Sequence, residues 1–396
     1  MGGAEAEGPP AGDRLIAREL ITVRPPIEQA LLVGAPRKGS PEARDVEEHL
    51  AELARLADTA GARVVGTVVQ FIAKPTPDLY VGHGKADEVG RRVLDLGASL
   101  VIFDEELSPR QGKHLEDLLK VRVMDRTELI LDIFALRARS REARLQVELA
   151  QLEYLLPRLT RMWAHLSRIR GGIGLRGPGE TQLETDRRMI REKIGVLKRK
   201  LVEVAEHRGR LRAHTRDRGV VKVALVGYTN AGKSSLLRAL TGADVHVEDR
   251  LFATLDTQSR EIRISGSRTS DPGFRVRFTD TVGFIRKLPH DLVASFRATL
   301  EEAADADVVL HVVDASHPAW QEQAEVVGEV LHGVLADGGR APRVVVALNK
   351  ADLLAPEEAA QRSRDAAARG WEVVATSAAT GSGVAELGAL VSRALT

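Results

Sequence analysis

Residues 227–234 carry the feature that most restricts how this chain can fold. They read Gly-Tyr-Thr-Asn-Ala-Gly-Lys-Ser, a G-x-x-x-x-G-K-S pattern. An apolar strand pattern precedes it at 220–226 and a helical pattern follows at 235–240, which is the setting a phosphate-binding loop requires. There, backbone N–H groups and the helix N-terminus point at negative charge. The motif therefore predicts an α/β fold in which Lys233 reaches the outer phosphates and Ser234 binds magnesium.

A second motif, Asp-Thr-Val-Gly at residues 280–283, ends another strand pattern. Alone, D-x-x-G is common. After a phosphate-binding loop it predicts that Asp280 holds magnesium through water and that the Gly283 N–H meets the terminal phosphate. Between the two motifs, Thr254 lies where a mobile threonine would close on magnesium and that phosphate, with Thr257 as the competing candidate.

The base-specifying signal is Asn-Lys-Ala-Asp at residues 349–352, after an apolar run at 344–348. The Asp352 carboxylate can accept two hydrogen bonds from guanine, whereas adenine offers no matching pair and would leave the carboxylate unpaired. Ser377-Ala378 follows one more strand pattern and fits a backbone contact to the guanine oxygen. Together these motifs predict a P-loop GTPase domain that binds GTP and GDP and hydrolyses GTP.

We expect a set of residues in these segments to contact GTP or its magnesium. They are Gly227, Tyr228, Thr229, Asn230, Ala231, Gly232, Lys233, Ser234, Ser235, Phe252, Ala253, Thr254, Asp280, Thr281, Val282, Gly283, Asn349, Lys350, Asp352, Ser377 and Ala378. The predicted magnesium ligands are Ser234, Thr254 and Asp280, and the predicted catalytic residues are Lys233, Thr254 and Gly283. Phe284 stands where Ras-like enzymes place a water-orienting glutamine, so turnover without a partner is expected to be slow.

With 396 residues, the chain is long enough for two or three domains. Residues 1–22 are predicted to be a disordered tail and residues 219–396 the GTPase domain. Residues 23–136 alternate apolar and amphipathic segments, which predicts a small parallel-sheet α/β domain. The expected strands are 30–33, 64–71, 100–103 and 121–124, and the expected helices are 41–60, 85–96 and 108–119.

Residues 137–213 are predicted to form a coiled-coil hairpin of two helices with a glycine-rich tip. Apolar residues spaced 4, 3 and 4 apart at 145–156 are repeated at 190–204. Two ordinary core-packing helices are the alternative. The tip is rich in cations and aromatic residues that suit RNA phosphates and unpaired bases, although a solvated charged surface would look the same. These residues are Tyr154, Arg158, Arg161, Trp163, Arg168, Arg170, Arg176, Arg187, Arg188 and Arg191.

The composition says more about the cellular compartment of the protein than about its function. The chain has no cysteine, which fits a reducing compartment, and its net charge of +1 decides nothing about nucleic acid. No stretch approaches the roughly 20 apolar residues of a membrane span, and the first residues do not form a signal peptide. We therefore expect a cytoplasmic monomer with no membrane span.

Beyond the GTPase motifs, the chain resembles the HflX family of translation-factor-class GTPases over nearly its whole length after the tail. The resemblance rests on residues 80–85, 124–128, 146–156, 171–182 and 280–285, of which Gly-Pro-Gly-Glu-Thr-Gln at 177–182 is the most specific. It implies binding to the large ribosomal subunit and its ribosomal RNA through the N-terminal domain and hairpin. Some members split stalled ribosomes, and some carry a further C-terminal domain for which no counterpart is expected here.

The resemblance leaves other functions open. A GTPase in ribosome assembly or tRNA modification, or a signalling switch whose hairpin binds a protein, would carry the same nucleotide motifs. Asn230 occupies the loop position that binds potassium in the potassium-stimulated GTPases it resembles, so K⁺ joins GTP, GDP and Mg²⁺ as an expected cofactor.

Asp352→Asn tests the predicted base specificity. An amide in place of the double acceptor should weaken GTP binding and favour xanthosine triphosphate, because the hydrogen-bonding edge of xanthine matches the amide. Competition between the two triphosphates for a fluorescent nucleotide measures the change. GTP affinity equal to that of the parent would mean that Asp352 does not read the base.

Overall fold

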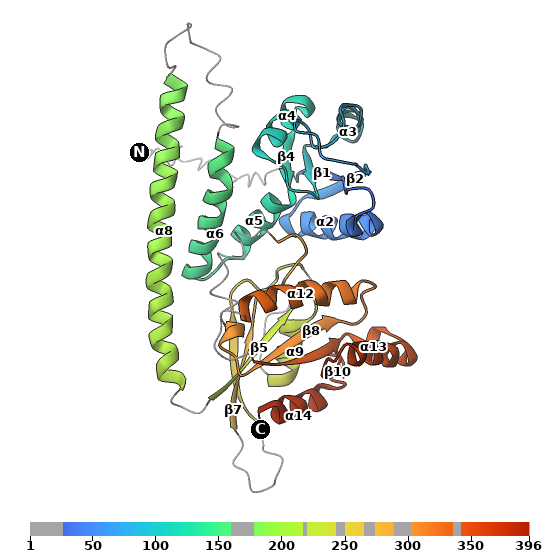
Figure 1. Ribbon diagram of the computed structural model, residues 1–396, viewed down its shortest axis with the longest axis vertical. Coiled ribbons are helices and arrows are strands. Elements are labelled where there is room, and N and C mark those ends of the chain that lie inside the picture. Colours follow the sequence, from blue (N-terminus) through green and yellow to red (C-terminus); the bar gives the residue numbers. More distant parts are fainter. Residues whose placement is uncertain are drawn as a thin grey trace, which may run out of the picture.

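The computed structural model describes residues 27–159, 178–216, 220–242, 250–264, 274–288, 302–335 and 342–395. It contains two α/β units, one above the other in Figure 1, with the long helices α6 (Arg141–Leu155) and α8 (Pro178–Arg216) along one side. The predicted tail at 1–22 lies outside the described residues. Within the described part, no helix is both long and apolar enough to cross a membrane.

The N-terminal unit is built on a four-stranded sheet in which every pair is parallel, in the order β2-β1-β3-β4. Because helices cover both faces, the residues of β1 after its first are all buried. Helices α2 and α5 pack on one face and α3 and α4 on the other. The elements are β1 (Gln29–Gly34), α1 (Pro41–Arg44), α2 (Val46–Ala60), β2 (Arg63–Val69), α3 (His83–Leu96), β3 (Leu100–Phe103), α4 (Pro109–Leu119), β4 (Arg122–Asp125) and α5 (Arg126–Arg137).

The C-terminal unit contains a six-stranded sheet in the order β10-β9-β8-β5-β7-β6, in which β6 alone among the described strands runs antiparallel to its neighbour. Helices α9 and α14 cover one face and α12 the other. The elements are β5 (Val220–Gly227), α9 (Lys233–Thr241), β6 (Gln258–Ile264), β7 (Phe274–Asp280), β8 (Val308–Asp314), α12 (Trp320–Leu335), β9 (Arg343–Asn349), η3 (Ala351–Leu353), α13 (Pro356–Ala368), β10 (Val373–Ala375) and α14 (Val384–Leu395). The predicted α/β fold is confirmed: the N-terminal sheet is parallel, as expected, and the C-terminal sheet is parallel except for β6.

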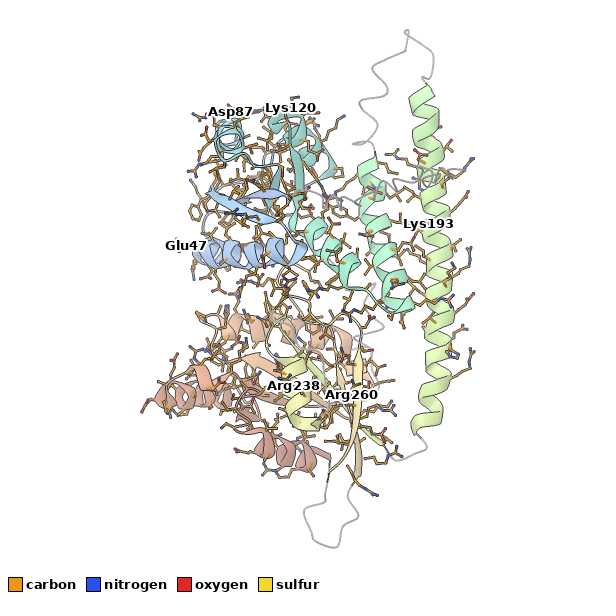
Figure 2. All side chains as sticks on the ribbon, turned by 180° about the vertical axis from the view of Figure 1, so that it is seen from behind. Glu47, Asp87, Lys120, Lys193, Arg238 and Arg260 are labelled. Atoms are coloured by element: carbon orange, nitrogen blue, oxygen red, sulfur yellow. The ribbon has the colours of Figure 1, made fainter. Side chains whose placement is uncertain are left out.

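Helices α6 and α8 lie side by side and run antiparallel, with the short helix η1 (Leu156–Arg158) following α6 (Figure 1). Lys193 pairs with Glu148 at 2.6 Å across the two helices, on the stretch of α8 labelled in Figure 2. Of the four leucines of the first predicted seam, Leu149 is buried, and Leu145, Leu152 and Leu156 are half-buried, the last of them in η1. The opposite side of α6 packs on α5, so α6 is held between two helices. The predicted glycine-rich tip at 160–177 lies outside the described residues.

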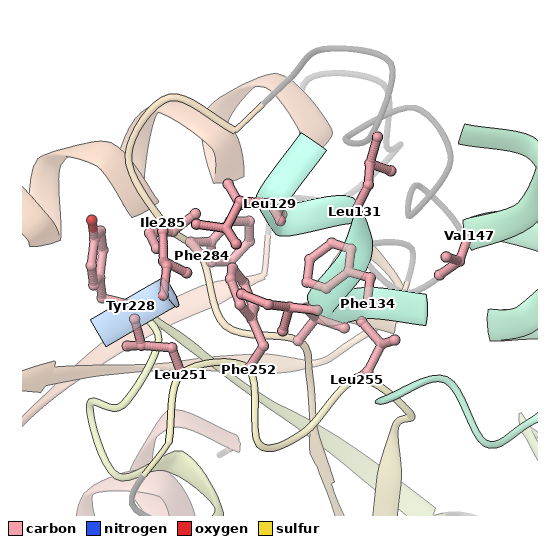
Figure 3. Close-up of a cluster of buried hydrophobic side chains, with 14 of the residues drawn as sticks. Leu129, Leu131, Phe134, Val147, Tyr228, Leu251, Phe252, Leu255, Phe284 and Ile285 are labelled. Atoms are coloured by element: carbon pink, nitrogen blue, oxygen red, sulfur yellow. The ribbon is translucent and has the colours of Figure 1, made fainter. Parts of the chain in front are cut away.

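A single apolar cluster joins the two α/β units (Figure 3). Phe134 of α5 meets Phe252 edge-on, with ring centroids 4.6 Å apart and planes at 85°. Leu129 and Val147 pack in the same cluster as Phe284 of the C-terminal unit. Offset or edge-on aromatic pairs add to the free energy gained from burial, so this contact stabilises one particular arrangement of the two units.

Candidate functional site

The loop between β5 and α9 wraps tightly around the space where phosphates would lie. Gly232 has φ 89°, and a Cβ there would stand 2.3 Å from the side-chain nitrogen of Asn349, so the position requires glycine. The Lys233 ammonium donates to the carbonyl oxygens of Gly227, at 3.2 Å, and Tyr228, at 3.0 Å. Burial lowers the pKa of Lys233 to about 8, and Asp280 only partly opposes this effect. Phosphate oxygens beside the ammonium would reverse the shift.

The three predicted magnesium ligands meet behind this loop. The Ser234 hydroxyl lies 2.8 Å from the Thr254 hydroxyl and 2.5 Å from the Asp280 carboxylate. Thr254 is buried in this group, whereas Thr257 is exposed. The other Asp280 oxygen, Oδ1, is buried and has no hydrogen-bond partner among the described residues. Hydroxyl and carboxylate oxygens are the donors that Mg²⁺ takes, so these residues fit the ion.

Burial raises the pKa of Asp280, and Lys233 and the hydroxyl hydrogen bonds oppose the rise. A bound divalent cation would favour the charged carboxylate, because opposite charge within a few ångströms stabilises the ionised form.

Gly283 lies directly against the phosphate-binding loop. A Cβ there would stand 2.7 Å from Thr229 Cα and 3.0 Å from the Lys233 ammonium, so only glycine fits. The next residue is paired with the loop, because Phe284 accepts from the Thr229 N–H at 2.6 Å and donates to the Gly227 carbonyl at 3.1 Å. The Phe284 ring is buried in the apolar cluster between the units, away from the loop (Figure 3).

Asn349 links the base-specifying segment to the phosphate-binding loop. Its amide donates to the Ala231 carbonyl at 2.9 Å and accepts from the Ala378 N–H at 3.0 Å. Lys350 has φ 62° and pairs with Asp314 at 2.7 Å. Asp352 is exposed on η3, where its carboxylate is open to an incoming base.

A cavity of about 320 Å³ lies at the carboxyl edge of the sheet, and all but one of its lining residues were predicted from the motifs. The lining consists of Thr229, Asn230, Gly232, Lys233, Ser234, Ser235, Arg250, Phe252, Ala253, Thr254, Gly283 and Lys350. Sequence reasoning missed Arg250, a single basic residue outside any motif.

Two predicted residues direct their side chains away from this cavity. The Tyr228 hydroxyl donates to Glu52 of the N-terminal unit, and the Thr281 hydroxyl donates to the Leu225 carbonyl at 2.7 Å. Asp352, Ser377 and Ala378 lie beyond the cavity lining, on the side of the base-specifying segment. Any contact of Tyr228 or Thr281 with a nucleotide would therefore come from the backbone of these residues.

The expectation that Arg158 and Tyr154 face RNA is wrong. Arg158 is buried, stacks 3.5 Å above the Tyr154 ring and donates to the Leu107 carbonyl at 2.7 Å. The Tyr154 hydroxyl donates to Asp125 at 3.0 Å. Both side chains therefore attach the C-terminal end of α6, next to the tip segment, to the N-terminal unit.

The other predicted RNA-facing residues divide into two groups. On α8, Arg188 and Arg191 are exposed and Arg187 is partly exposed. Arg161, Trp163, Arg168, Arg170 and Arg176 lie outside the described residues.

A phosphate-binding loop on a six-stranded sheet, with D-x-x-G and N-K-x-D segments converging on one cavity, defines a P-loop GTPase. Family models agree along the chain: "GTP-binding GTPase N-terminal" matches residues 47–135, "GTP-binding GTPase Middle Region" matches 137–215 and "50S ribosome-binding GTPase" matches 222–350.

The chain belongs to the HflX family, whose members bind and hydrolyse GTP. GTPase HflX of Caldanaerobacter subterraneus subsp. tengcongensis is 51% identical over 327 residues, which cover 83% of this chain and 73% of the relative. GTPase HflX of Escherichia coli K12 is 49% identical over 311 residues, covering 78% and 71%. The crystal structure of SsGBP with GDP covers 93% of this chain and 98% of its own at 22% identity and a TM-score of 0.50, which is a likeness of fold alone.

Nucleotide binding should take up a proton at alkaline pH. Burial lowers the pKa of Lys233 to about 8, so a fraction of the free protein should carry a neutral Lys233 at pH 8.5, and phosphates would recharge it. GDP affinity should therefore fall as pH rises above 8, by up to about tenfold per unit. Calorimetric titration in buffers of different ionisation heat at pH 8.5 measures the uptake, with pH 7 as the control. Buffer-independent heats at pH 8.5 would contradict the prediction.

Proposed function

We propose that this protein is a GTP-hydrolysing factor that binds the large ribosomal subunit in the cytoplasm and remodels or splits ribosomes under stress. The family model that matches the C-terminal unit is described as a 50S ribosome-binding GTPase. The observation that carries the enzymatic part is the convergence of Lys233, Ser234, Thr254, Asp280 and Gly283 on one cavity edge.

Each of these residues has a role in phosphoryl transfer, which depends on positioning and charge stabilisation. Lys233 holds the outer phosphates, and the Gly283 N–H and Thr254 close on the terminal phosphate. Ser234, Thr254 and Asp280 would hold magnesium, which would neutralise charge on the phosphate oxygens. Asp352 selects guanine, while Asn349 keeps the base-specifying segment in register with the loop.

Slow intrinsic turnover follows from Phe284. Its ring is buried between the units and carries no group that could orient water. We propose that the ribosome completes the site and that K⁺ near Asn230, which has φ 61° in the loop, adds positive charge beside the phosphates.

Hydrolysis assays with and without large subunits test this account. The parent should turn over slowly alone, faster with subunits, and faster in potassium chloride than in sodium chloride. Asn230→Ala should remove the potassium effect while retaining GTP binding. Fast turnover without ribosomes would contradict the role given to Phe284, and equal rates in the two salts would contradict the role given to Asn230.

The ribosome contact is proposed for exposed cations of α8 and for the tip that precedes it. On α8 these cations include Arg188, Arg191, Arg199 and Lys200. A partner with phosphates is favoured because arginine forks match phosphate oxygens and because these cations are exposed along one long helix.

Replacing Arg188 and Arg191 together with alanine should weaken ribosome binding and reduce its salt dependence. Each lost phosphate contact lowers the slope of log affinity against log salt by about 1. Co-sedimentation with large subunits at several salt concentrations measures both, in the presence of a non-hydrolysable GTP analogue. The matched control replaces Arg364 and Arg393, two exposed arginines of the C-terminal unit. If both double variants bind equally well with equal slopes, the contact lies elsewhere.

A further inference from the structure

The chain that follows Gly283 leaves the phosphate site and enters the N-terminal unit. We call residues 250–256 switch I and residues 283–287 switch II, from their places beside the cavity. The Arg286 guanidinium is nearly buried and lies 3.6 Å from the carboxylates of both Glu48 and Glu52. The Lys287 ammonium lies 2.5 Å from Asp104. Arg286 also pairs with Glu322 of α12, in its own unit, at 3.2 Å. Switch II therefore ends in two cations that both contact carboxylates of the N-terminal unit.

Lys287 reaches a particular place in the N-terminal sheet. Asp104 and Glu105 directly follow β3, and the Glu105 carboxylate accepts the Ala35 N–H, just past β1, at 2.9 Å. In the N-terminal sheet β2 lies on one side of β1, and β3 and β4 lie on the other side. The direction in which successive strands are added to the sheet therefore reverses between β1 and β3. Open α/β sheets bind ligands at the carboxyl edge where the order reverses. Switch II thus occupies the ligand position of the N-terminal sheet.

Two buried carboxylates of the N-terminal unit, Glu52 and Asp104, have all their cationic partners only when switch II is in place. Burial would raise the pKa of Glu52, but Arg126 and Arg286 outweigh it and hold the pKa below its ordinary value. Burial acts in the same way on Asp104 and is outweighed by Arg126 and Lys287. Of the three cations, Arg126 belongs to the N-terminal unit, while Arg286 and Lys287 come from switch II. If switch II withdraws, buried carboxylates lose partners, which is costly.

Tyr228 connects this charged cluster to the phosphate-binding loop. Its hydroxyl donates to the Glu52 carboxylate at 2.6 Å and accepts the Arg286 N–H at 2.9 Å. The phosphate-binding loop, switch II and the N-terminal unit therefore share the Tyr228 hydroxyl as one hydrogen-bonded group.

Switch I is held by the same unit and by the link between α5 and α6. Phe252 packs edge-on against Phe134, and the Asp256 carboxylate accepts the N–H groups of Arg139 and Ser140 at 3.0 and 2.9 Å. Thr254 lies between these two anchors and points at Ser234, 2.8 Å away. The N-terminal unit therefore contacts both switches in the arrangement in which Thr254 and Gly283 face the phosphate site.

We propose that the N-terminal unit raises the affinity for GTP relative to that for GDP by binding both switches in this closed arrangement, with Lys287, Asp104, Glu52 and Tyr228 as positioning residues. The proposal rests on the proposed closure of Thr254 and Gly283 on the terminal phosphate. GTP stabilises the closed switches through that phosphate, and the N-terminal unit stabilises the same arrangement through Lys287. Because such coupling is reciprocal, weakening the contact between the units must weaken GTP binding more than GDP binding.

The test uses the full chain and measures dissociation constants of fluorescent GDP and GTPγS. Lys287→Met and Asp104→Asn should each lower the affinity advantage of GTPγS over GDP by about fivefold or more, with GDP affinity nearly unchanged. The double variant should lose no more of the GTPγS advantage than the single variant with the larger loss, because both substitutions remove the same Lys287–Asp104 interaction. An unchanged advantage in all three folded variants would overturn the proposal.

The matched control is Lys193→Met with Glu148→Gln, an ion pair between α6 and α8 that touches neither switch. It should leave the GTPγS advantage unchanged. An equal loss in the control would overturn the proposal, because the effect would then not depend on the switches.

Amide hydrogen exchange on the parent protein provides a measurement that needs no variant. Residues 283–287 and the residues around Asp104 should be better protected with GTPγS than with GDP, and equal protection would overturn the proposal.

Thr254→Ala distinguishes failure of the proposed role of Thr254 from failure of the coupling through the N-terminal unit. If Thr254→Ala keeps the full GTPγS advantage, the assignment of Thr254 fails. If Thr254→Ala reduces it while Lys287→Met does not, only the coupling through the N-terminal unit fails.

Discussion

The Glu52 carboxylate is the group on which the arrangement of the two α/β units depends. It is almost completely buried and is bonded to Arg126 in its own unit and to the Tyr228 hydroxyl in the other, with Arg286 3.6 Å away. A buried carboxylate of this kind is tolerated only when its partners are present, and removing one partner of a buried ion pair costs about 3–5 kcal/mol. Glu52 therefore specifies the relative arrangement of the two units, while the apolar cluster around Phe134 and Phe252 contributes the hydrophobic stabilisation of their contact.

This contact places the N-terminal unit against the parts of a P-loop GTPase that respond to the terminal phosphate. A loop that has to move is normally exposed to solvent at the edge of its domain. Here Phe252 and Phe284 are buried, Lys287 is bonded to the N-terminal unit, and Asp256 is bonded to the link between α5 and α6. A change at the phosphate site must consequently alter a packed interface, which has discrete arrangements rather than a continuous range.

Much of the nucleotide site was predictable because its chemistry is local in sequence. The loop at 227–234 and the pair Asn349 and Asp352 need particular residue types at particular spacings, and the strands that carry them read as apolar runs. Helix α5 was missed, because its hydrophobic residues face several directions between the sheet, α2 and α6. Arg158 was misjudged for a related reason: a charged residue in a basic segment looks solvated until Tyr154 and Asp125 are seen beside it.

The sequence by itself determined the parallel α/β units, the class of nucleotide and most of the residues around the phosphate cavity, since each depends on residues that are neighbours along the chain or on a periodic pattern. Only the tertiary structure showed that Tyr228 serves the interface with its side chain, and that Lys287 fills the carboxyl edge of the other sheet. Those contacts join residues up to 183 positions apart. No spacing rule encodes them, because their partners are chosen by the way two finished surfaces match in shape and charge.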